Sequence, residues 1–150
     1  MTVPEVQRLK LPPQNQEAEQ SVLGGMLLDN ESIHKVVEAL IPEDFYRGAH
    51  GRIYSAILNL YQRSEPVDLV TVTNILKTLG QLDEVGGASY LATLVDSVPS
   101  AANVASYARI IREKAIVRKL IEGATAIVEQ GLSEDLESAD DFVDKAEKII

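Results

Sequence analysis

The sequence predicts an all-α fold, a compact bundle of about five short helices followed by a protruding antiparallel helical hairpin. Apolar residues recur at spacings of three and four along almost the whole chain after Gln14. Strand signals are scarce: the stretch 67–72 is β-branched, but its aspartate cap and its spacing of three to four favour helix. In the last third, two helical patterns are joined by a short link, which favours a hairpin.

The N-terminal third is predicted to hold an arm and two helices. Residues 1–13 show no apolar periodicity and are expected to form a flexible arm. The first helix is predicted from about Asn15 to Leu28, and its pair Gly24-Gly25 would permit another helix to pack closely. The second follows Asn30 and stops before Pro42, because a proline disfavours helix in the residue before it.

Three further helices complete the predicted bundle. A helix from about Ala49 to Gln62 is apolar on most sides, so it is central or covered by a partner. Asp68 is well placed to cap the next helix, and Gly80 to end it. A short helix follows Gly86-Gly87 and ends at Pro99. Residues 14–99 are therefore predicted to form one globular helical domain.

Residues 100–150 are predicted to form the hairpin. Ser100 is expected to cap a long helix that runs to about Gln130, and a second helix follows Ser138. A fold at about residue 134 would bring Ile150 near Lys119. Two helices cannot bury both of their apolar stripes on each other. Either the hairpin folds back on the bundle or it packs on the hairpin of another subunit, and its length favours the second.

The predicted surface for self-association is the apolar stripe of the hairpin. For any one of its residues, packing within the same chain is the equal alternative. The stripe consists of Ile111, Val117, Leu120, Ile121, Ala124, Phe142, Val143 and Ala146.

Composition and charge restrict the function. The net charge is −9, with 14 basic and 23 acidic residues, whereas binding to a phosphate backbone requires a surplus of Lys and Arg. Strong direct DNA binding is therefore not expected, although the basic segment 109–119 keeps a DNA-binding module as a rival hypothesis. The chain has no cysteine, no apolar run of about 20 residues and no secretory signal pattern, which favours a cytoplasmic protein without membrane contact.

Signals of catalysis and of cofactor binding are scarce. A phosphate-binding P-loop needs a Gly-Lys step, and the chain contains none. The two histidines, His34 and His50, are not at metal-ligand spacing. We therefore predict no catalytic residue, cofactor or metal in this chain, and expect His50 to be a surface or hydrogen-bonded residue. A hydrolase using His50 and a carboxylate remains a rival, and it would require an organised cleft around His50.

Five short strings occur in order along residues 12–150. They are Pro12-Pro13-Gln14 through Glu17 to Gly25; Asp44-Phe45-Tyr46-Arg47 with His50; Pro66-Val67-Asp68 through Val72; Gly86-Gly87 with Tyr90-Leu91; and Val98 through Asn103 with Tyr107-Ala108. Each string alone is a weak signal, but their order and spacing are specific. Together they resemble the N-terminal region of bacterial replicative DNA helicases of the DnaB family.

The resemblance implies a role at the replication fork, in the cytoplasm at the nucleoid. Full-length relatives are ring hexamers and ATP-dependent 5′–3′ DNA helicases. A RecA-like C-terminal motor domain binds ATP and magnesium and contacts the DNA, and that domain is not in this chain. This chain would be the non-catalytic collar, whose hairpins pair into dimers and whose three dimers complete the ring.

The resemblance also implies partners. The collar of the family recruits the C-terminal domain of primase, and a helicase loader is a further candidate partner. For the primase contact we select Glu17 and Tyr90, which are polar-tipped side chains near helix starts, although Tyr90 could equally belong to the core. The alternative function is a free-standing helical protein–protein adaptor without a motor.

Overall fold

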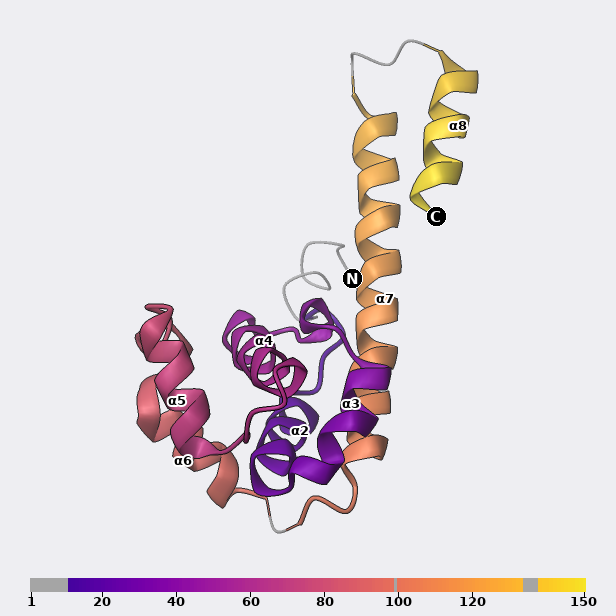
Figure 1. Cartoon of the computed structure of the whole chain (residues 1–150). Coiled ribbons are helices and arrows are strands. Elements are labelled where there is room, and N and C mark those ends of the chain that lie inside the picture. Colours follow the sequence, from indigo (N-terminus) through magenta and orange to yellow (C-terminus); the bar gives the residue numbers. More distant parts are fainter. Residues whose placement is uncertain (1–10, 99, 134–137) are drawn as a thin grey trace. The chain divides into compact units, whose positions relative to one another are not determined.

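The computed structural model describes residues 11–98, 100–133 and 138–150, and all regular structure within them is helical (Figure 1). This confirms the predicted all-α fold class. Contacts divide the chain into two compact units, a globular unit of residues 14–115 and a hairpin unit of residues 116–150 together with 1–13. No helix among the described residues is both long enough and apolar enough to cross a membrane.

The globular unit contains a series of short helices joined by tight 3-10 turns. The α-helices are α2 (Gln16–Leu28), α3 (Ile33–Ala39), α4 (Gly48–Gln62), α5 (Leu69–Thr78), α6 (Gly87–Asp96) and the beginning of α7 (Val104–Gly131). The 3-10 turns are η1 (Asn30–Ser32), η2 (Pro42–Asp44) and η3 (Asp83–Val85). These bounds lie close to those that apolar periodicity and the capping residues predict.

The predicted helix ends are visible in the hydrogen bonds of α5. The Asp68 carboxylate accepts the Thr71 N–H at 2.8 Å, and the Thr71 hydroxyl accepts the Asp68 N–H at 2.9 Å. This reciprocal pair satisfies two N–H groups that have no partner inside the helix. At the other end, Gly80 has a φ of 71° and lets the Gln81 N–H reach the Leu76 carbonyl at 2.9 Å.

Helix α4 is the centre of the globular core, as its apolar surface predicts. It contacts α2 and α5, and Ile53, Tyr54 and Ile57 are fully buried. The Tyr54 hydroxyl donates to the Leu40 carbonyl at 2.9 Å, so the ring is buried without an unsatisfied polar group. Burial, and secondarily the negative charge of Asp44, raise the pKa of Tyr54 well above the ordinary tyrosine range.

The pair Gly24-Gly25 lets two other segments approach α2 closely, which confirms the predicted packing role. A Cβ atom on Gly24 would lie 2.2 Å from the Leu94 carbonyl oxygen in α6. A Cβ on Gly25 would lie 2.4 Å from a methyl carbon of Val104 in α7. Neither distance is compatible with a side chain, so glycine at both positions sets how closely these helices pack.

The globular unit extends beyond the predicted boundary at residue 99. Val104, Ala108 and Ile111 in the first turns of α7 are buried in the core. Arg112, also in α7, donates to the buried Asp44 carboxylate at 2.9 Å. These contacts attach the beginning of α7 to the globular unit, which explains why the hairpin unit begins at residue 116.

Ser100 does not cap the long helix as the sequence suggests. Its hydroxyl accepts the Ala102 N–H at 3.1 Å, and the Val104 N–H bonds the Ala101 carbonyl at 3.3 Å. A turn therefore occupies these residues, and α7 begins at Val104.

The hairpin unit pairs the second part of α7 with α8 (Ala139–Ile149), which is capped by the Ser138 hydroxyl. Figure 1 shows α8, in yellow, running antiparallel beside that part of α7. A Cβ on Gly131 would lie 3.1 Å from the Phe142 ring, and one on Gly123 would lie 3.0 Å from Ile149. The predicted hairpin is thus confirmed.

The alignment of the two hairpin helices differs from the one predicted. Ile149 lies against Gly123, about one helical turn from the position that a fold at residue 134 gives. The two glycines of α7 leave room for the large apolar side chains of α8, and this fit sets the alignment. The predicted fold point itself, at 134, lies outside the described residues.

Only the last residues of the predicted N-terminal arm are described. The Pro13 carbonyl accepts a hydrogen bond from the Arg118 guanidinium at 2.7 Å, within the hairpin unit. Residues 1–10 of the predicted flexible arm lie outside the described residues.

Candidate partner-docking site

A buried hydrogen-bonded pair of ionisable residues joins α2 to α4. Glu19 Oε1 lies 2.7 Å from His50 Nδ1, and the two residues are 1% and 0% exposed. An ionisable pair this far from water is stable only where its remaining polar atoms are bonded as well.

The Glu19 carboxylate also organises the start of α4. It accepts the Tyr46 N–H at 2.7 Å and the Arg47 N–H at 3.4 Å. Arg47, the N-cap residue of α4, makes no side-chain capping bond of its own. A carboxylate from another helix therefore satisfies N–H groups at this end, where a negative charge is favoured by the helix dipole.

The second nitrogen of His50 connects this pair to α6. His50 Nε2 lies 2.6 Å from the Tyr90 hydroxyl, whose oxygen accepts hydrogen bonds from Gln20 Nε2 at 3.3 Å and Arg47 Nη1 at 3.5 Å. With its proton on Nδ1, His50 donates to Glu19 and accepts from the tyrosine O–H. Each of these polar groups then has a hydrogen-bond partner. Helices α2, α4 and α6 thus share one hydrogen-bonded network.

Gly86 explains why Tyr90 can take this position. Gly86 precedes α6 with a φ of 107°, a left-handed conformation that glycine adopts without strain. A Cβ on Gly86 would lie 2.8 Å from the Tyr90 Cβ. Gly86, the first of the two glycines, therefore leaves space for the tyrosine side chain.

The selected primase-contact residues lie in different surroundings. Glu17 is exposed on α2, two residues before the buried Glu19. Tyr90 is only partly exposed, and its hydroxyl is engaged in the network with His50. Tyr90 is thus both a surface residue and a structural one.

The selected hairpin residues divide into three groups. Val117, Leu120, Ile121, Ala124 and Val143 are exposed in the hairpin unit, whereas Phe142 and Ala146 are partly buried. The assignment of Ile111 to this stripe is corrected, because its side chain is 2% exposed and belongs to the core of the globular unit. Its side chain is already used by intramolecular packing and does not belong to the exposed stripe.

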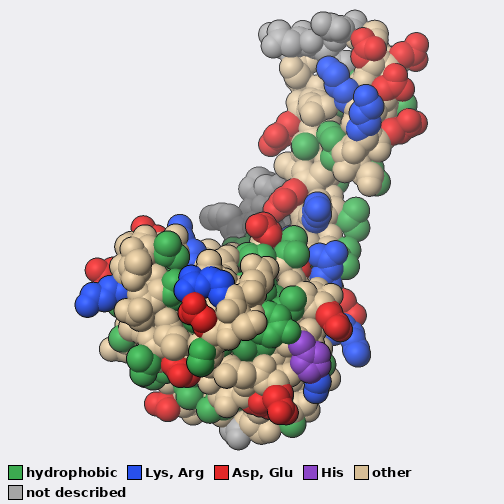
Figure 2. Space-filling view, viewed as in Figure 1, with side chains coloured by type: hydrophobic (Ala, Val, Ile, Leu, Met, Phe, Trp, Pro, Cys, Tyr) green, Lys and Arg blue, Asp and Glu red, His purple; other side chains and the backbone are tan. Residues whose placement is uncertain are grey.

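The hairpin unit leaves large apolar side chains in contact with solvent. No residue of α8 is buried, and Leu120 and Val143 are 56% and 51% exposed. Figure 2 shows acidic side chains gathered over α8 with hydrophobic ones beside them. A helix pair with this little burial gains little stability from its own packing.

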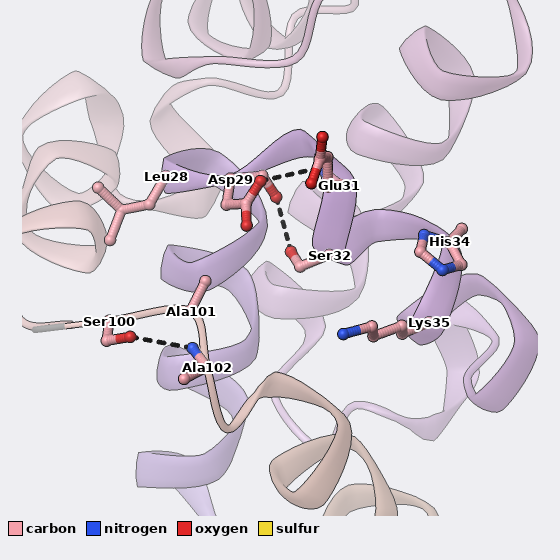
Figure 3. A pocket seen from close by; sticks show the side chains of 9 residues that line it. All are labelled: Leu28, Asp29, Glu31, Ser32, His34, Lys35, Ser100, Ala101 and Ala102. Carbon is pink, nitrogen blue, oxygen red and sulfur yellow. Dashed lines mark hydrogen bonds between the residues drawn. The ribbon is translucent and has the colours of Figure 1, made fainter.

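A polar depression of about 520 Å³ in the globular unit lies between the end of α2, the start of α3 and residues 100–102. Figure 3 shows its hydroxyl groups engaged with the backbone: Ser32 donates to the Asp29 carbonyl at 2.7 Å, and Ser100 accepts the Ala102 N–H. Asp29 caps η1 by accepting the Glu31 N–H. These polar groups stabilise turns and do not form a nucleophile–base pair.

The environment of His50 is that of a structural residue. The expectation that it is hydrogen-bonded is confirmed, and a surface position is ruled out by its complete burial. Because both ring nitrogens are occupied and no solvent reaches them, His50 cannot meet a substrate. Across residues 11–98, 100–133 and 138–150 no group of three or more His, Cys, Asp and Glu side chains could hold a metal ion.

Sequence reasoning did not select Glu19, Gln20 and Arg47 as members of the network. A signal for Glu19 was available, since it precedes Val22 and Met26 by three and seven residues and so lies on the apolar stripe of α2. His50 has the same relation to Ile53 and Ile57 in α4. A charged or polar residue on an apolar stripe requires a buried partner.

The family is decided by a match that covers most of the chain. Residues 11–113 match the model of the DnaB-like helicase N-terminal domain. The chain belongs to this family. The replicative DNA helicase DnaB of Geobacillus stearothermophilus is 50% identical over 141 residues, which are 94% of this chain and 31% of that protein. The chain thus spans about a third of the length of this DnaB relative.

Solved DnaB structures agree with this assignment. The N-terminal domain of DnaB helicase from Mycobacterium tuberculosis is 49% identical, with a TM-score of 0.89 over 93% of this chain and 98% of that one. A DnaB-like replicative helicase, described together with its interactions with primase, is 30% identical with a TM-score of 0.70. That match covers 91% of this chain and 32% of the helicase chain.

Proposed function

We propose that this chain is the non-catalytic collar of a hexameric replicative DNA helicase, which mediates subunit pairing and docks primase at the replication fork. The observation that carries the proposal is the match to the solved DnaB N-terminal domain over nearly the whole of both chains. In the full-length protein, a motor domain would bind ATP and magnesium and contact DNA.

The exposed stripe of the hairpin unit supports pairing with a second copy of this chain. Val117, Leu120 and Ile121 present apolar surface on α7, and Val143 does so on α8. Burying such side chains against an identical hairpin would remove them from water, each gaining on the order of 1.5–3 kcal/mol when fully covered. Three such dimers would complete the hexamer.

Self-association is tested by sedimentation of this chain over a range of concentrations. Leu120→Ser should shift the dimer–monomer equilibrium toward monomer, because it places a hydroxyl group in the proposed apolar contact. Leu79→Ser is the matched control, since Leu79 is 57% exposed but lies in the globular unit. Equal association of the two variants would contradict pairing through the hairpin.

Primase docking is supported by the 30% identical helicase that is described with its interactions with primase. Glu17 and Tyr90 are the proposed contact residues, both on the surface of the globular unit. A helicase loader is a further proposed partner, for which no residue is assigned.

Docking is tested by calorimetric titration of this chain with the C-terminal domain of primase from the same organism. Saturable binding is expected, and Glu17→Ala should weaken it, whereas Glu38→Ala, an exposed change on α3, should not. Absence of heat at concentrations well above those of a weak complex would contradict the docking role.

A further inference from the structure

Arg47 occupies an unusual place at the surface of the Glu19–His50–Tyr90 network. Its guanidinium lies over the Tyr90 ring, with Cζ 5.6 Å from the ring centroid, and Nη1 donates to the Tyr90 hydroxyl at 3.5 Å. Its backbone N–H is held by the buried Glu19 carboxylate at 3.4 Å. Arg47 is therefore hydrogen-bonded at its backbone and at its guanidinium while its side chain remains partly exposed.

Three other arginines of the globular unit have a carboxylate partner. Arg52 pairs with Glu84 at 3.5 Å, Arg112 with Asp44 at 2.9 Å, and Arg63 with Glu65. Arg47 makes no such ion pair within the part of the chain that the structure describes. Its charge is instead placed against an aromatic face, in a protein whose net charge is −9.

We propose that Arg47, held on Tyr90 by the buried Glu19–His50 pair, is a binding point for a carboxylate of the docked primase domain. A guanidinium presents several N–H groups in one plane, and only Nη1 is engaged with Tyr90. The remaining N–H groups suit the two oxygens of a carboxylate, and stacking on the ring fixes their direction. The inference rests on the proposed docking function and adds to it a residue and the chemistry that this residue recognises.

The contacts with Tyr90 are what distinguish Arg47 from a freely solvated surface arginine. A free arginine loses side-chain entropy when it binds a partner, and the contacts with Tyr90 reduce this loss for Arg47. His50 acts here as a positioning residue, because its bond to the hydroxyl at 2.6 Å holds the tyrosine that carries the guanidinium.

The same guanidinium could bind a phosphate, so the source of the anion has to be decided. The acidic net charge of −9 repels a polyanion such as single-stranded DNA and disfavours phosphate backbone binding. A single carboxylate on a protein surface is not accompanied by a row of further negative charges, as each phosphate of a nucleic acid is. The carboxylate is therefore the anion that this surface favours.

The test is a calorimetric titration of this chain and its variants with the C-terminal domain of primase at two salt concentrations. Arg47→Ala should weaken binding on the order of tenfold, the loss of one charge-assisted contact, and reduce the dependence of affinity on salt. Arg47→Lys should recover only part of the affinity, because an ammonium lacks the planar donors. Arg52→Ala is the control and should bind like the wild type.

A charge-reversal experiment tests whether Arg47 contacts a carboxylate of primase. Arg47→Glu should abolish most of the binding, and a glutamate-to-lysine or aspartate-to-lysine change on the facing primase surface should restore it. Unfolding midpoints of all variants show whether the fold is retained. Should Arg47→Ala lose its fold, Arg47→Gln replaces it, since the longer side chain keeps the contact with Tyr90.

Each contrary outcome has a separate meaning. Wild-type affinity and salt dependence in Arg47→Ala or Arg47→Gln would overturn the carboxylate site and leave primase docking intact. Absence of binding by the wild-type chain would overturn both. Saturable binding of single-stranded DNA that is lost in Arg47→Ala would also overturn the carboxylate assignment.

Discussion

Glycines in two regions of the molecule allow close helix packing, with different consequences. A Cβ on Gly24 in the globular unit would lie 2.2 Å from the Leu94 carbonyl oxygen, which is part of a helix backbone. A Cβ on Gly123 in the hairpin unit would lie 3.0 Å from a methyl carbon of Ile149, at the end of α8. The first neighbour is rigid and the second is a movable side chain.

The two regions also differ in what the close approach buries. Around Gly24, fully buried apolar side chains of α2 and α6 form part of a continuous core. Around Gly123, no residue of α8 is buried and much of the apolar surface remains exposed. Close packing therefore surrounds a continuous core in the globular unit, whereas in the hairpin unit it leaves much of the apolar surface exposed.

The largest effect is expected from breaking the buried pair of the globular unit. His50→Leu leaves the Glu19 carboxylate buried with only backbone N–H partners, and should lower the free energy of unfolding by about 3–5 kcal/mol. Denaturant unfolding measures the loss. The double variant Glu19→Gln with His50→Leu should recover part of it, and an unchanged midpoint in His50→Leu would contradict the structural role of the pair.

A smaller loss is expected from Gly24→Ala. The new methyl group meets a helix backbone that cannot move aside, so the variant should be less stable by about 1–3 kcal/mol in a thermal unfolding experiment. Gly48→Ala is the matched control, because a Cβ at Gly48 meets nothing. Equal stability of the two variants would show that α2 and α6 can separate without cost.

Tyr54→Phe should cost about 1 kcal/mol at neutral pH, since it removes the bond to the Leu40 carbonyl. Because the pKa of Tyr54 is raised in the folded protein, the folded state holds the phenolic proton more tightly than the unfolded state does. Stability from this group is complete below the ordinary tyrosine pKa of 10.0 and falls as the pH rises above it.

Unfolding curves at neutral and alkaline pH test this prediction. The wild type should lose stability faster than Tyr54→Phe above pH 10.0, so that the difference between them narrows. Tyr61→Phe, a change on an exposed ring, should follow the wild type at both pH values. A constant difference between wild type and Tyr54→Phe would contradict a shifted titration of Tyr54.

The smallest effect is expected from Gly123→Ala, the counterpart of Gly24→Ala. The Ile149 side chain can rotate away, and alanine favours helix by about 1 kcal/mol over glycine, so the two terms nearly cancel. The free energy of unfolding should stay within about 0.5 kcal/mol of the wild-type value. A loss as large as that of Gly24→Ala would remove the distinction between the two regions.

Local structure was largely predictable from the sequence because its signals are local. Asp68 and Gly80 marked the ends of α5, and the predicted span of the first helix differs from α2 by a single residue at its start. Turn and cap chemistry depends on residues three or four apart, which a sequence displays directly.

The network and the hairpin alignment were not predictable in the same way. Glu19 and His50 are 31 residues apart, and His50 and Tyr90 are 40 apart. Periodicity places each residue on a face of its helix but does not say which faces meet. Ile111 shows the same limit, since one stripe on α7 serves the core in its first turns and the solvent in its later ones.

The complete burial of His50 also makes this residue a spectroscopic reporter. Its Nδ1 proton lies in a 2.7 Å hydrogen bond out of contact with water, so it should exchange slowly and give a resolved downfield resonance in NMR spectra. The other histidine, His34, is exposed, and its ring protons exchange too quickly to interfere. A single signal can therefore report on the Glu19–His50–Tyr90 network in the titrations that test docking.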